Sequence, residues 1–473
     1  MDPERSVEDQ FSKLHPCMPV NTRIGIVGAG PSGLSAAYAL ARLGYNNITV
    51  LEKHHAVGGM CESVEIEGKI YDLGGQVLAA SSAPIIFNLA KETGSPLEEM
   101  DSHKLAIIDS SSGQYQDVKV ADDYVSVMSL TLEIQEKVKN SGRFGVHAVS
   151  EVASDPTPDY LECHGLKHVP KSVAYGYTAS GYGFIQDMPY AYIHEFTRTS
   201  MAGKIRRFKG GYTSLWQRIA ESLPIKLHCN TEVLAIKRNS DRVIVNVKSS
   251  NEIETMEFDK IIISGNFPLK YGRTYRSVPS TCLESETEVM DVSELEKDLF
   301  SKVETNDYYT TVLKIKGFEN MPIGFYYFNE YMEDPSTIGN PVAMQKFYAD
   351  TNIFLFWSYG NSVDIKGPNV TELATKAVEA MGGEVENFIL QRRFKYFPHV
   401  SSQDMKNGFY EKLESELQGS RNTYYVGGLM AFELTERNSS YAMALISKKF
   451  ANSSDFPVFP YTKVIWHITT PVS

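Results

Sequence analysis

The first clear pattern along the chain is a short apolar run, a glycine-rich turn and an Ala- and Leu-rich stretch. The run Ile24–Val27 leads into glycines, which is typical of a buried parallel strand. Residues 32–43 predict a helix that Gly44 ends as a C-cap. Ile48–Leu51 is a second buried run of the same kind. Strand, turn, helix and strand make one βαβ unit of about 30 residues.

Beyond this unit, strands and helices alternate. Alternating polar and apolar residues predict strands, with Asp241 in a hairpin turn between two of them. The predicted strands lie at 64–78, 225–230, 232–250, 252–264 and 421–428, and the predicted helices at 83–94, 212–222 and 441–451. Residues 125–205 read as mostly helical, and residues 285–390 mix both elements. This order of elements indicates an α/β fold.

Composition limits the kinds of partner. The 473 residues include 46 Lys and Arg against 58 Asp and Glu, which gives a formal net charge of −12. A dispersed acidic surface is unsuited to nucleic acid, because phosphate requires a basic face. Two or three domains are expected at this length, and no stretch reaches the roughly 18 apolar residues of a spanning helix. We expect no nucleic-acid partner and no transmembrane segment, and the oligomeric state stays open.

The cysteines and the N-terminal residues bear on the compartment. Five cysteines are widely spaced without a CxxC pair, so neither a disulfide framework nor a zinc site is expected. Such cysteines favour a reducing compartment. The first residues are acidic and lack the apolar core of a signal peptide. These features predict a cytoplasmic protein without a bound metal, with residues 1–21 and 456–473 as tails.

A glycine fingerprint opens the predicted helix. Gly28, Gly30 and Gly33 have GxGxxG spacing, in which the first glycine permits a tight turn, the second lets the backbone approach pyrophosphate, and the third brings helix against strand. Glu52 ends the second strand, where a carboxylate accepts hydrogen bonds from a ribose. Because strand, helix, second strand and acid are all in place, we predict a dinucleotide site. The neighbouring residues expected to contribute are Ala29, Ser32 and Lys53.

Two glycine pairs decide which dinucleotide is expected. Gly58-Gly59 follows Glu52 by six residues and would let a loop fold back over the phosphates, which is typical of FAD proteins. Gly75, the second glycine of its pair, and Gln76 lie on the next strand, where the backbone could approach a flavin. No second GxGxxG motif occurs to hold NAD(P)H. The predicted cofactor is therefore FAD, and the substrate is expected to be oxidised directly by the flavin.

With FDKIIIS at 258–264 and YYVGG at 424–428, these motifs resemble the flavin-containing amine oxidase superfamily over residues 22–450. The resemblance implies a Rossmann-type FAD-binding domain with an inserted α+β substrate-binding domain. The implied FAD-binding segments are 22–110, 205–275 and 390–455, and the substrate or cap segments are 111–204 and 276–389. The residues implied to contact FAD, besides those above, are Met60, Val233, Gly427, Gly428 and Met430. The covalent-flavin cysteine motif is missing, so FAD is expected to be non-covalent.

A more extended resemblance is to the bacterial polyenoic fatty acid isomerases, which move double bonds with FAD and without net redox change. It rests on residues 396–428 and on GYGF at 181–184, followed by Pro189 and Tyr192. Near the start of their cap region the isomerases carry arginines suited to a fatty-acid carboxylate. The matching stretch here, residues 103–108, offers only Lys104 and is otherwise apolar.

Two positions depart from the superfamily pattern near the expected cofactor. Met60 stands where many members carry Arg or Lys after the glycine doublet, so backbone N–H groups would have to do more at the pyrophosphate. Gly428 replaces the acid of the YAGE-like version of the YYVGG segment.

Aromatic residues are the candidates for a substrate site. They are Tyr175, Tyr177, Tyr182 and Phe184, with Phe208 before a second glycine turn. An aromatic pocket suits a long unsaturated substrate, an aromatic cage suits an amine, and ordinary core packing is the alternative. Lys302 is a candidate for the lysine that amine oxidases place near flavin N5, or else a surface lysine. His399 is either a site residue or a structural histidine.

Three functions remain open at this point, because the flavin carries the chemistry and the protein orients it. The first is an FAD-dependent isomerase or desaturase that abstracts a hydride from an apolar, unsaturated, lipid-like small molecule. The second is an FAD-dependent amine oxidase that releases hydrogen peroxide. The third is a flavin-binding protein with altered catalysis, which the changes at Met60 and Gly428 suggest.

Overall fold

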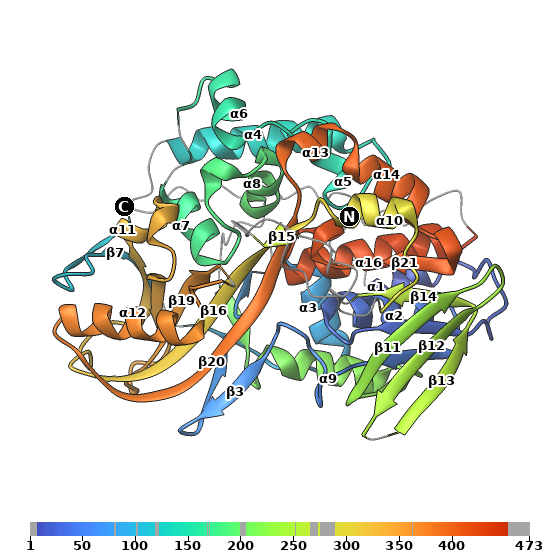
Figure 1. The fold of residues 1–473 in the computed structure, drawn as a ribbon, viewed down its shortest axis with the longest axis horizontal. Coiled ribbons are helices and arrows are strands. Elements are labelled where there is room, and N and C mark those ends of the chain that lie inside the picture. Colours follow the sequence, from blue (N-terminus) through green and yellow to red (C-terminus); the bar gives the residue numbers. More distant parts are fainter. Residues whose placement is uncertain are drawn as a thin grey trace.

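Two lobes lie side by side in the computed structural model, one built on a parallel sheet and one on a larger mixed sheet (Figure 1). The structure describes residues 7–452 except 80–81, 101–102, 119–122, 168, 170, 199–204, 251, 265–272, 275–288 and 362. Helices of the segment 123–197 lie above both lobes in Figure 1.

The parallel sheet is the framework of the first lobe. Its strand order is β10-β2-β1-β14-β21. The bounds are β1 Ile24–Val27, β2 Ile48–Leu51, β10 Lys226–His228, β14 Lys260–Ile263 and β21 Thr423–Tyr425. Strands β1 and β2 are buried along their whole length, as the continuous apolar runs require of strands covered on both faces.

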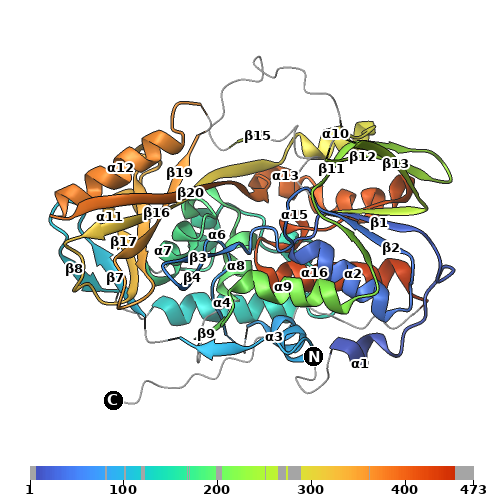
Figure 2. The same ribbon diagram turned by 90° about the horizontal axis from the view of Figure 1, so that it is seen from below.

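Both faces of this sheet are covered. Helices α2 (Pro31–Arg42), α9 (Tyr212–Ser222) and α16 (Thr435–Phe450) lie on one side, and an antiparallel sheet lies on the other (Figure 2). That second sheet consists of β11 (Thr231–Arg238), β12 (Val243–Ser249) and β13 (Glu252–Phe258). The Phe258 ring packs so closely on β1 that a Cβ on Gly25 would lie 2.9 Å from it.

The second lobe is built on a sheet with the order β15-β16-β19-β18-β17-β7-β8, to which β20 adds on β16. The bounds are β7 Lys104–Ile108, β8 Tyr115–Asp117, β15 Arg273–Thr274, β16 Glu304–Lys316, β17 Gly324–Phe328, β18 Pro341–Lys346, β19 Ile353–Gly360 and β20 Glu384–His399. Helix α12 (Gly367–Ala380) packs on one face of this sheet and helix α7 (Lys171–Ala179) lies toward the other (Figure 1).

Shorter elements join the lobes. The strands are β3 Ser63–Ile66, β4 Lys69–Asp72, β5 Leu78–Ala79, β6 Leu97–Glu99 and β9 Ile205–Phe208. The helices are α1 Val7–Phe11, α3 Pro84–Glu92, α4 Asp123–Val138, α5 His147–Ser150, α6 Thr157–Cys163, α8 Tyr190–Thr197, α10 Glu294–Phe300, α11 Asn329–Met332, α13 Ser402–Lys406, α14 Phe409–Lys412 and α15 Gly428–Ala431. Across these described residues, no helix is long and apolar enough to cross a membrane.

The structure confirms the α/β class and refines the expected boundaries. Strand β7 and residues 390–399 of β20, expected in the cofactor lobe, pair with the second lobe's sheet. Part of the expected N-terminal tail is helix α1, because Val7 and Phe11 insert their side chains into the core. Residues 1–6 and 456–473 lie outside the described residues.

Candidate functional site

The glycine turn after β1 has the geometry that a close helix–strand junction requires. Gly28 has a φ of +100°, and its N–H donates to the Leu51 carbonyl at 2.8 Å. A Cβ on Gly33 would overlap the Gly28 carbonyl oxygen, so only glycine lets α2 start this close to β1. Ser32 is buried in the first turn of α2, while Gly30 keeps accessible surface. The turn thus presents the first N–H groups of a twelve-residue helix to a ligand.

The glycine doublet folds back over this turn, as predicted. Gly58 and Gly59 have φ values of +113° and +54°, and the Gly58 N–H donates to the Ala29 carbonyl at 2.9 Å. A Cβ on Gly30 would meet only the Gly59 backbone, at 3.7 Å. Gly59 is exposed and Met60 is half-buried. Two backbones without side chains therefore form a narrow polar cradle.

Glu52 lies at the entrance to the cradle. Its Oε2 accepts the Ala29 N–H at 2.8 Å and its Oε1 accepts the His54 N–H at 2.9 Å, and the residue is 5 % exposed. Lys53 beside it is exposed. Val233 lies on β11 at a bulge between Val233 and Ala235 and is half-buried. The carboxylate is thus fixed by backbone donors at the end of β2.

A second close glycine contact follows strand β4 (Lys69–Asp72). A Cβ on Gly74 would overlap the Met60 carbonyl oxygen, and one on Gly75 would lie 2.8 Å from the Tyr212 ring. Gln76 is buried, and its Nε2 donates to Oε1 of Gln345 at 3.0 Å. The chain after β4 therefore passes close over the doublet and reaches the second lobe's sheet.

The carboxyl end of β21 completes the cleft. Gly427 has a φ of +138°, and Gly428 opens the short helix α15. Met430 is buried, and its carbonyl accepts the Val146 N–H at 2.8 Å. Strand β21 lies beside β14, which lies beside β1, so this loop and the glycine turn share one edge of the sheet.

These features coincide with a match to a known family. Residues 31–269 match the family model of flavin containing amine oxidoreductases. The chain belongs to this family. The expected membership is confirmed, and with it the class of flavin enzyme.

Individual curated proteins are similar to the chain over part of their length. It is 25 % identical to the polyenoic fatty acid isomerase of Ptilota filicina over 325 residues, which cover 60 % of this chain and 63 % of that protein. It is 26 % identical to the L-amino-acid oxidase of Sistrurus catenatus edwardsii over 270 residues, 51 % of this chain and 50 % of that protein. The chain thus spans less than two thirds of each of these curated relatives.

Solved structures share the fold over nearly the whole chain. The CLA-producing fatty acid isomerase from P. acnes superimposes with a TM-score of 0.78 at 22 % identity, covering 91 % of this chain and 99 % of that one. Putrescine oxidase bound to putrescine gives 0.60 at 14 % identity, covering 90 % and 97 %. A putative protoporphyrinogen oxidase from Exiguobacterium sp. 255-15 gives 0.63 at 15 % identity, covering 90 % and 98 %.

The aromatic candidates of this family member fall into two groups. The Tyr182 ring centroid lies 4.8 Å from that of Phe432 and 5.8 Å from that of Tyr396, on which it stacks. The Tyr182 hydroxyl donates to the Glu433 carbonyl at 2.9 Å. Tyr177 belongs to the same cluster. Tyr175 and Phe184 instead belong to the core between α7 and the second lobe's sheet. Ring contacts through Tyr396, Tyr308 and Tyr359 join the two groups, and one shared substrate lining stays a prediction.

Phe208 lies close to the contact between Gly75 and Tyr212. Its ring stacks on Tyr212 at 4.9 Å, and Tyr212 is the residue that a Cβ on Gly75 would meet. Gly75 and Gln76 were predicted on a strand, but they lie in the loop between β4 and β5, and Phe208 is one side chain away from this loop.

The two catalytic candidates lie in different environments. Lys302 follows α10, pairs with Asp298 at 2.8 Å and is about a third exposed, which is the surface alternative. His399 is buried, stacks on Phe397 at 4.9 Å, and burial lowers the pKa of its imidazole to about 4. His399 is therefore neutral at physiological pH.

Three residues that contact the predicted site residues were not predicted from the sequence. Gln345 is fully buried against Gln76, Tyr396 stacks on Tyr182, and Glu433 lies beside Gly428. Their sequence distance from the glycine motifs hides the first two. The acid at 433, five residues after a glycine that replaces an acid, was a readable signal.

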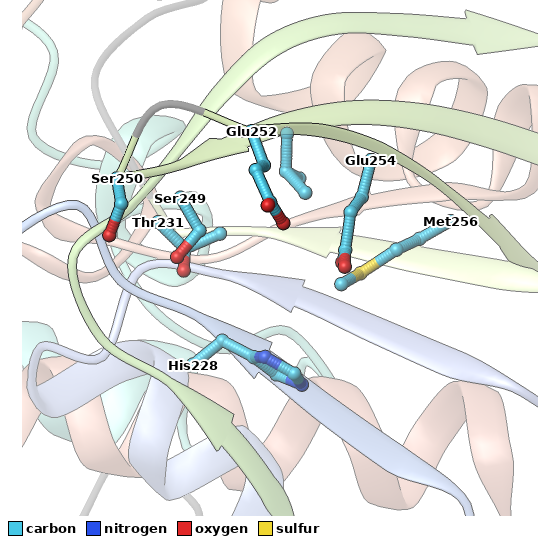
Figure 3. Close-up of a pocket in the computed structure, with 8 residues that line it drawn as sticks. His228, Thr231, Ser249, Ser250, Glu252, Glu254 and Met256 are labelled. Atoms are coloured by element: carbon cyan, nitrogen blue, oxygen red, sulfur yellow. The ribbon is translucent and has the colours of Figure 1, made fainter.

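A separate open hollow of about 520 Å³ lies beside the three-stranded sheet (Figure 3). Its lining is polar and acidic: His228, Thr231, Val247, Ser249, Ser250, Glu252, Glu254 and Met256. It adjoins Glu52 through two lining residues: the Thr231 N–H donates to the Glu52 carbonyl at 2.8 Å, and the Glu52 N–H donates to the His228 carbonyl at 2.8 Å. Within the described part of the chain, no group of three or more His, Cys, Asp or Glu side chains could hold a metal.

Proposed function

We propose that this chain is an FAD-dependent enzyme that moves or introduces double bonds in an apolar, unsaturated, lipid-like small molecule, with FAD bound non-covalently. The observation that carries the substrate class is the aromatic cluster around Tyr182 and Tyr396, next to Gly428 and without a charged histidine. The similarity to polyenoic fatty acid isomerases supports the reaction class.

The residues of the cleft fit FAD. The Gly30–Gly59 cradle leaves backbone close to a pyrophosphate, the α2 N-terminus offers N–H donors, and the Glu52 carboxylate suits a ribose. Gly75 and Phe208 would flank the flavin end. Bound FAD supplies a hydride acceptor and donor at its N5 atom.

The aromatic side chains would hold the substrate by their faces. Tyr182, Tyr308 and Tyr359 donate their hydroxyls to the carbonyls of Glu433, Ala179 and Thr178, at 2.9, 2.5 and 2.5 Å respectively. With those hydroxyls committed to the backbone, the rings offer mainly apolar surface, which suits an unsaturated chain better than a polar substrate. The half-buried Tyr396 is the ring with the most remaining surface among these.

One specific observation favours a second candidate, an FAD-dependent amine oxidase. Burial, together with the nearby Glu433 carboxylate, raises the pKa of Tyr396 well above its usual value, and an anion near aromatic faces suits an ammonium group. Putrescine oxidase and L-amino-acid oxidase are also among the similar proteins.

Anaerobic incubation of the yellow holoenzyme with linoleic or linolenic acid distinguishes the two. Isomerisation leaves the composition of the substrate unchanged, so conjugated-diene absorbance should rise without oxygen. An amine oxidase needs oxygen as electron acceptor and would release peroxide with mono- or polyamines and form no diene. Introducing a double bond would instead transfer two electrons to FAD, so the fatty acid would bleach the flavin without oxygen, and turnover would need dioxygen or another electron acceptor. A yellow protein that does none of these would favour a flavin-binding protein with altered catalysis.

A further inference from the structure

Glu433 occupies the space that a side chain at position 428 would need. A Cβ on Gly428 would overlap Oε2 of Glu433 and lie 2.5 Å from its Cδ. Position 428 is where the superfamily pattern has an acid and this chain has glycine. The structure thus brings a carboxylate from five residues further along the chain to the same place.

A strained backbone delivers this carboxylate. Phe432 has a φ of +75° with a ψ of +140°, a region that non-glycine residues rarely adopt. The hydroxyls of Tyr182 and Tyr396 donate to the Glu433 carbonyl at 2.9 and 3.3 Å, and the Phe432 ring packs on Phe397 at 5.4 Å. Strain of this kind persists only where the surroundings hold it, and it concentrates at functional sites.

The carboxylate is surrounded by protein but poorly paired. Burial raises the pKa of Glu433 to about 7, and yet the residue keeps accessible surface. Within the described chain, its recorded side-chain hydrogen bond is a long one of 3.5 Å from Asn438 Nδ2. Asn438 is 6 % exposed, and its Oδ1 has no partner among the described residues. Among the described residues, Asn438 Oδ1 therefore lacks a donor and the neighbouring Glu433 carboxylate has only a long hydrogen bond, which is rare for buried polar groups.

The segment that carries these acceptors lies next to the residues that join the glycine doublet to Gly75. Thr435, two residues after Glu433, has its Oγ1 3.8 Å from Cys61 Sγ. Cys61 follows the doublet Gly58-Gly59 by two residues, and a Cβ on Gly75 would lie 3.4 Å from its sulfur. Between its pyrophosphate and its flavin ring, FAD carries a ribityl chain, whose hydroxyl groups are hydrogen-bond donors.

We infer that Glu433, with Asn438, accepts hydrogen bonds from the ribityl hydroxyl groups of FAD and replaces the acid that is missing at Gly428. The inference rests on the proposed FAD function. It makes Glu433 a positioning residue for the cofactor. The Tyr182 and Tyr396 hydroxyls fix its backbone by donating hydrogen bonds to the Glu433 carbonyl.

The test is FAD binding to deflavinated protein, followed by flavin fluorescence quenching or calorimetry. Loss of a charge-assisted hydrogen bond is worth about tenfold or more in affinity, so Glu433→Ala should raise the Kd by about that factor. Glu433→Gln, which keeps the shape, should weaken binding as well. The matched control is Glu294→Gln, whose side chain is 92 % exposed on α10 and which should leave the Kd unchanged.

A swap sharpens the test. Gly428→Glu alone should lower FAD affinity strongly, because two carboxylates would compete for one space. Gly428→Glu combined with Glu433→Ala should recover much of that loss. Wild-type affinity in Glu433→Gln and Glu433→Ala, or unchanged binding in Gly428→Glu, would overturn the inference. Failure of the wild-type protein to bind FAD would instead overturn the proposed function.

Discussion

The backbones of Gly30 and Gly59 lie directly against each other: a Cβ on Gly59 would be 3.1 Å from the Gly30 Cα. This contact joins the turn after β1 to the doublet that follows β2. A side chain at either position would fill the cradle between them, and the φ of +54° at Gly59 also disfavours a branched residue there.

Gly30→Val should abolish FAD binding while leaving the protein folded. The branched side chain would occupy the space where the backbone approaches pyrophosphate. The FAD-to-protein absorbance ratio after purification measures the effect, and Ala41→Val, half-buried on the same helix, serves as the control. Full FAD occupancy in Gly30→Val would show that the phosphate site has been assigned to the wrong turn.

Gly33→Ala should lower the free energy of unfolding by about 1–3 kcal/mol. The added Cβ would overlap the Gly28 carbonyl oxygen and push helix α2 away from strand β1. Urea denaturation of the apoprotein measures this change. Gly210→Ala is the control: its Cβ would meet only the end of the Ser214 side chain, at 3.2 Å, and not backbone, so a change below about 0.5 kcal/mol is expected. Equal effects at both positions would contradict the close junction.

Glu52→Gln should weaken FAD binding and destabilise the turn. Both carboxylate oxygens accept backbone N–H groups, from Ala29 and His54, and an amide NH₂ would face one of these donors. We expect a loss of about 1–3 kcal/mol in unfolding free energy. Glu65→Gln, at an exposed position of β3, should change neither quantity.

The free energy of unfolding should decrease as the pH is lowered, because His399 titrates. Burial lowers its folded-state pKa to about 4 from the ordinary 6.5, so between these values the unfolded state binds more protons. The stabilising contribution of the neutral histidine is present above pH 6.5 and is lost as pH falls toward 4, by at most about 3 kcal/mol. Urea denaturation from pH 4 to 7 should show a shallower slope for His399→Gln; identical slopes would mean that His399 is protonated in the folded state.

Lys302→Met should leave FAD content and turnover within about twofold of the wild type. The lysine is paired with Asp298 on the surface, and exposed ion pairs contribute little. A large loss of turnover with retained flavin would restore Lys302 as a catalytic candidate.

The cofactor unit was predictable because its signals are local. The strand, the glycine spacing and Glu52 all lie within one βαβ unit, where hydrophobic pattern and turn chemistry determine the geometry. The doublet was predictable for the same reason. It folds onto the turn through a single hydrogen bond from Gly58 to Ala29.

The start of the last helix was not predictable from hydrophobic pattern. Helix α16 begins at Thr435, six residues before the expected start at 441, because its polar first turn is buried. Glu436 accepts the N–H groups of Ile85 and Ile86 at 3.1 and 3.0 Å, which completes the N-terminus of helix α3. The hydrogen-bond partners of Glu436 are about 350 positions away in the sequence, so the sequence pattern alone makes this polar turn look exposed.

The same limit applies to the site. Gln345 reaches Gln76 only through the pairing of the second lobe's strands, and Glu433 reaches Gly428 only through the positive φ of Phe432. Register between distant strands and one rare backbone conformation are tertiary features. The sequence indicated which acid was missing, but the fold decides which residue replaces it.

Acid precipitation of the purified protein tests the central claim most directly, because it separates bound flavin from the chain and identifies it. The account predicts a yellow supernatant with about one FAD per chain, confirmed by mass spectrometry, and a colourless pellet. A colourless protein, flavin that stays with the pellet, or a flavin other than FAD would contradict it.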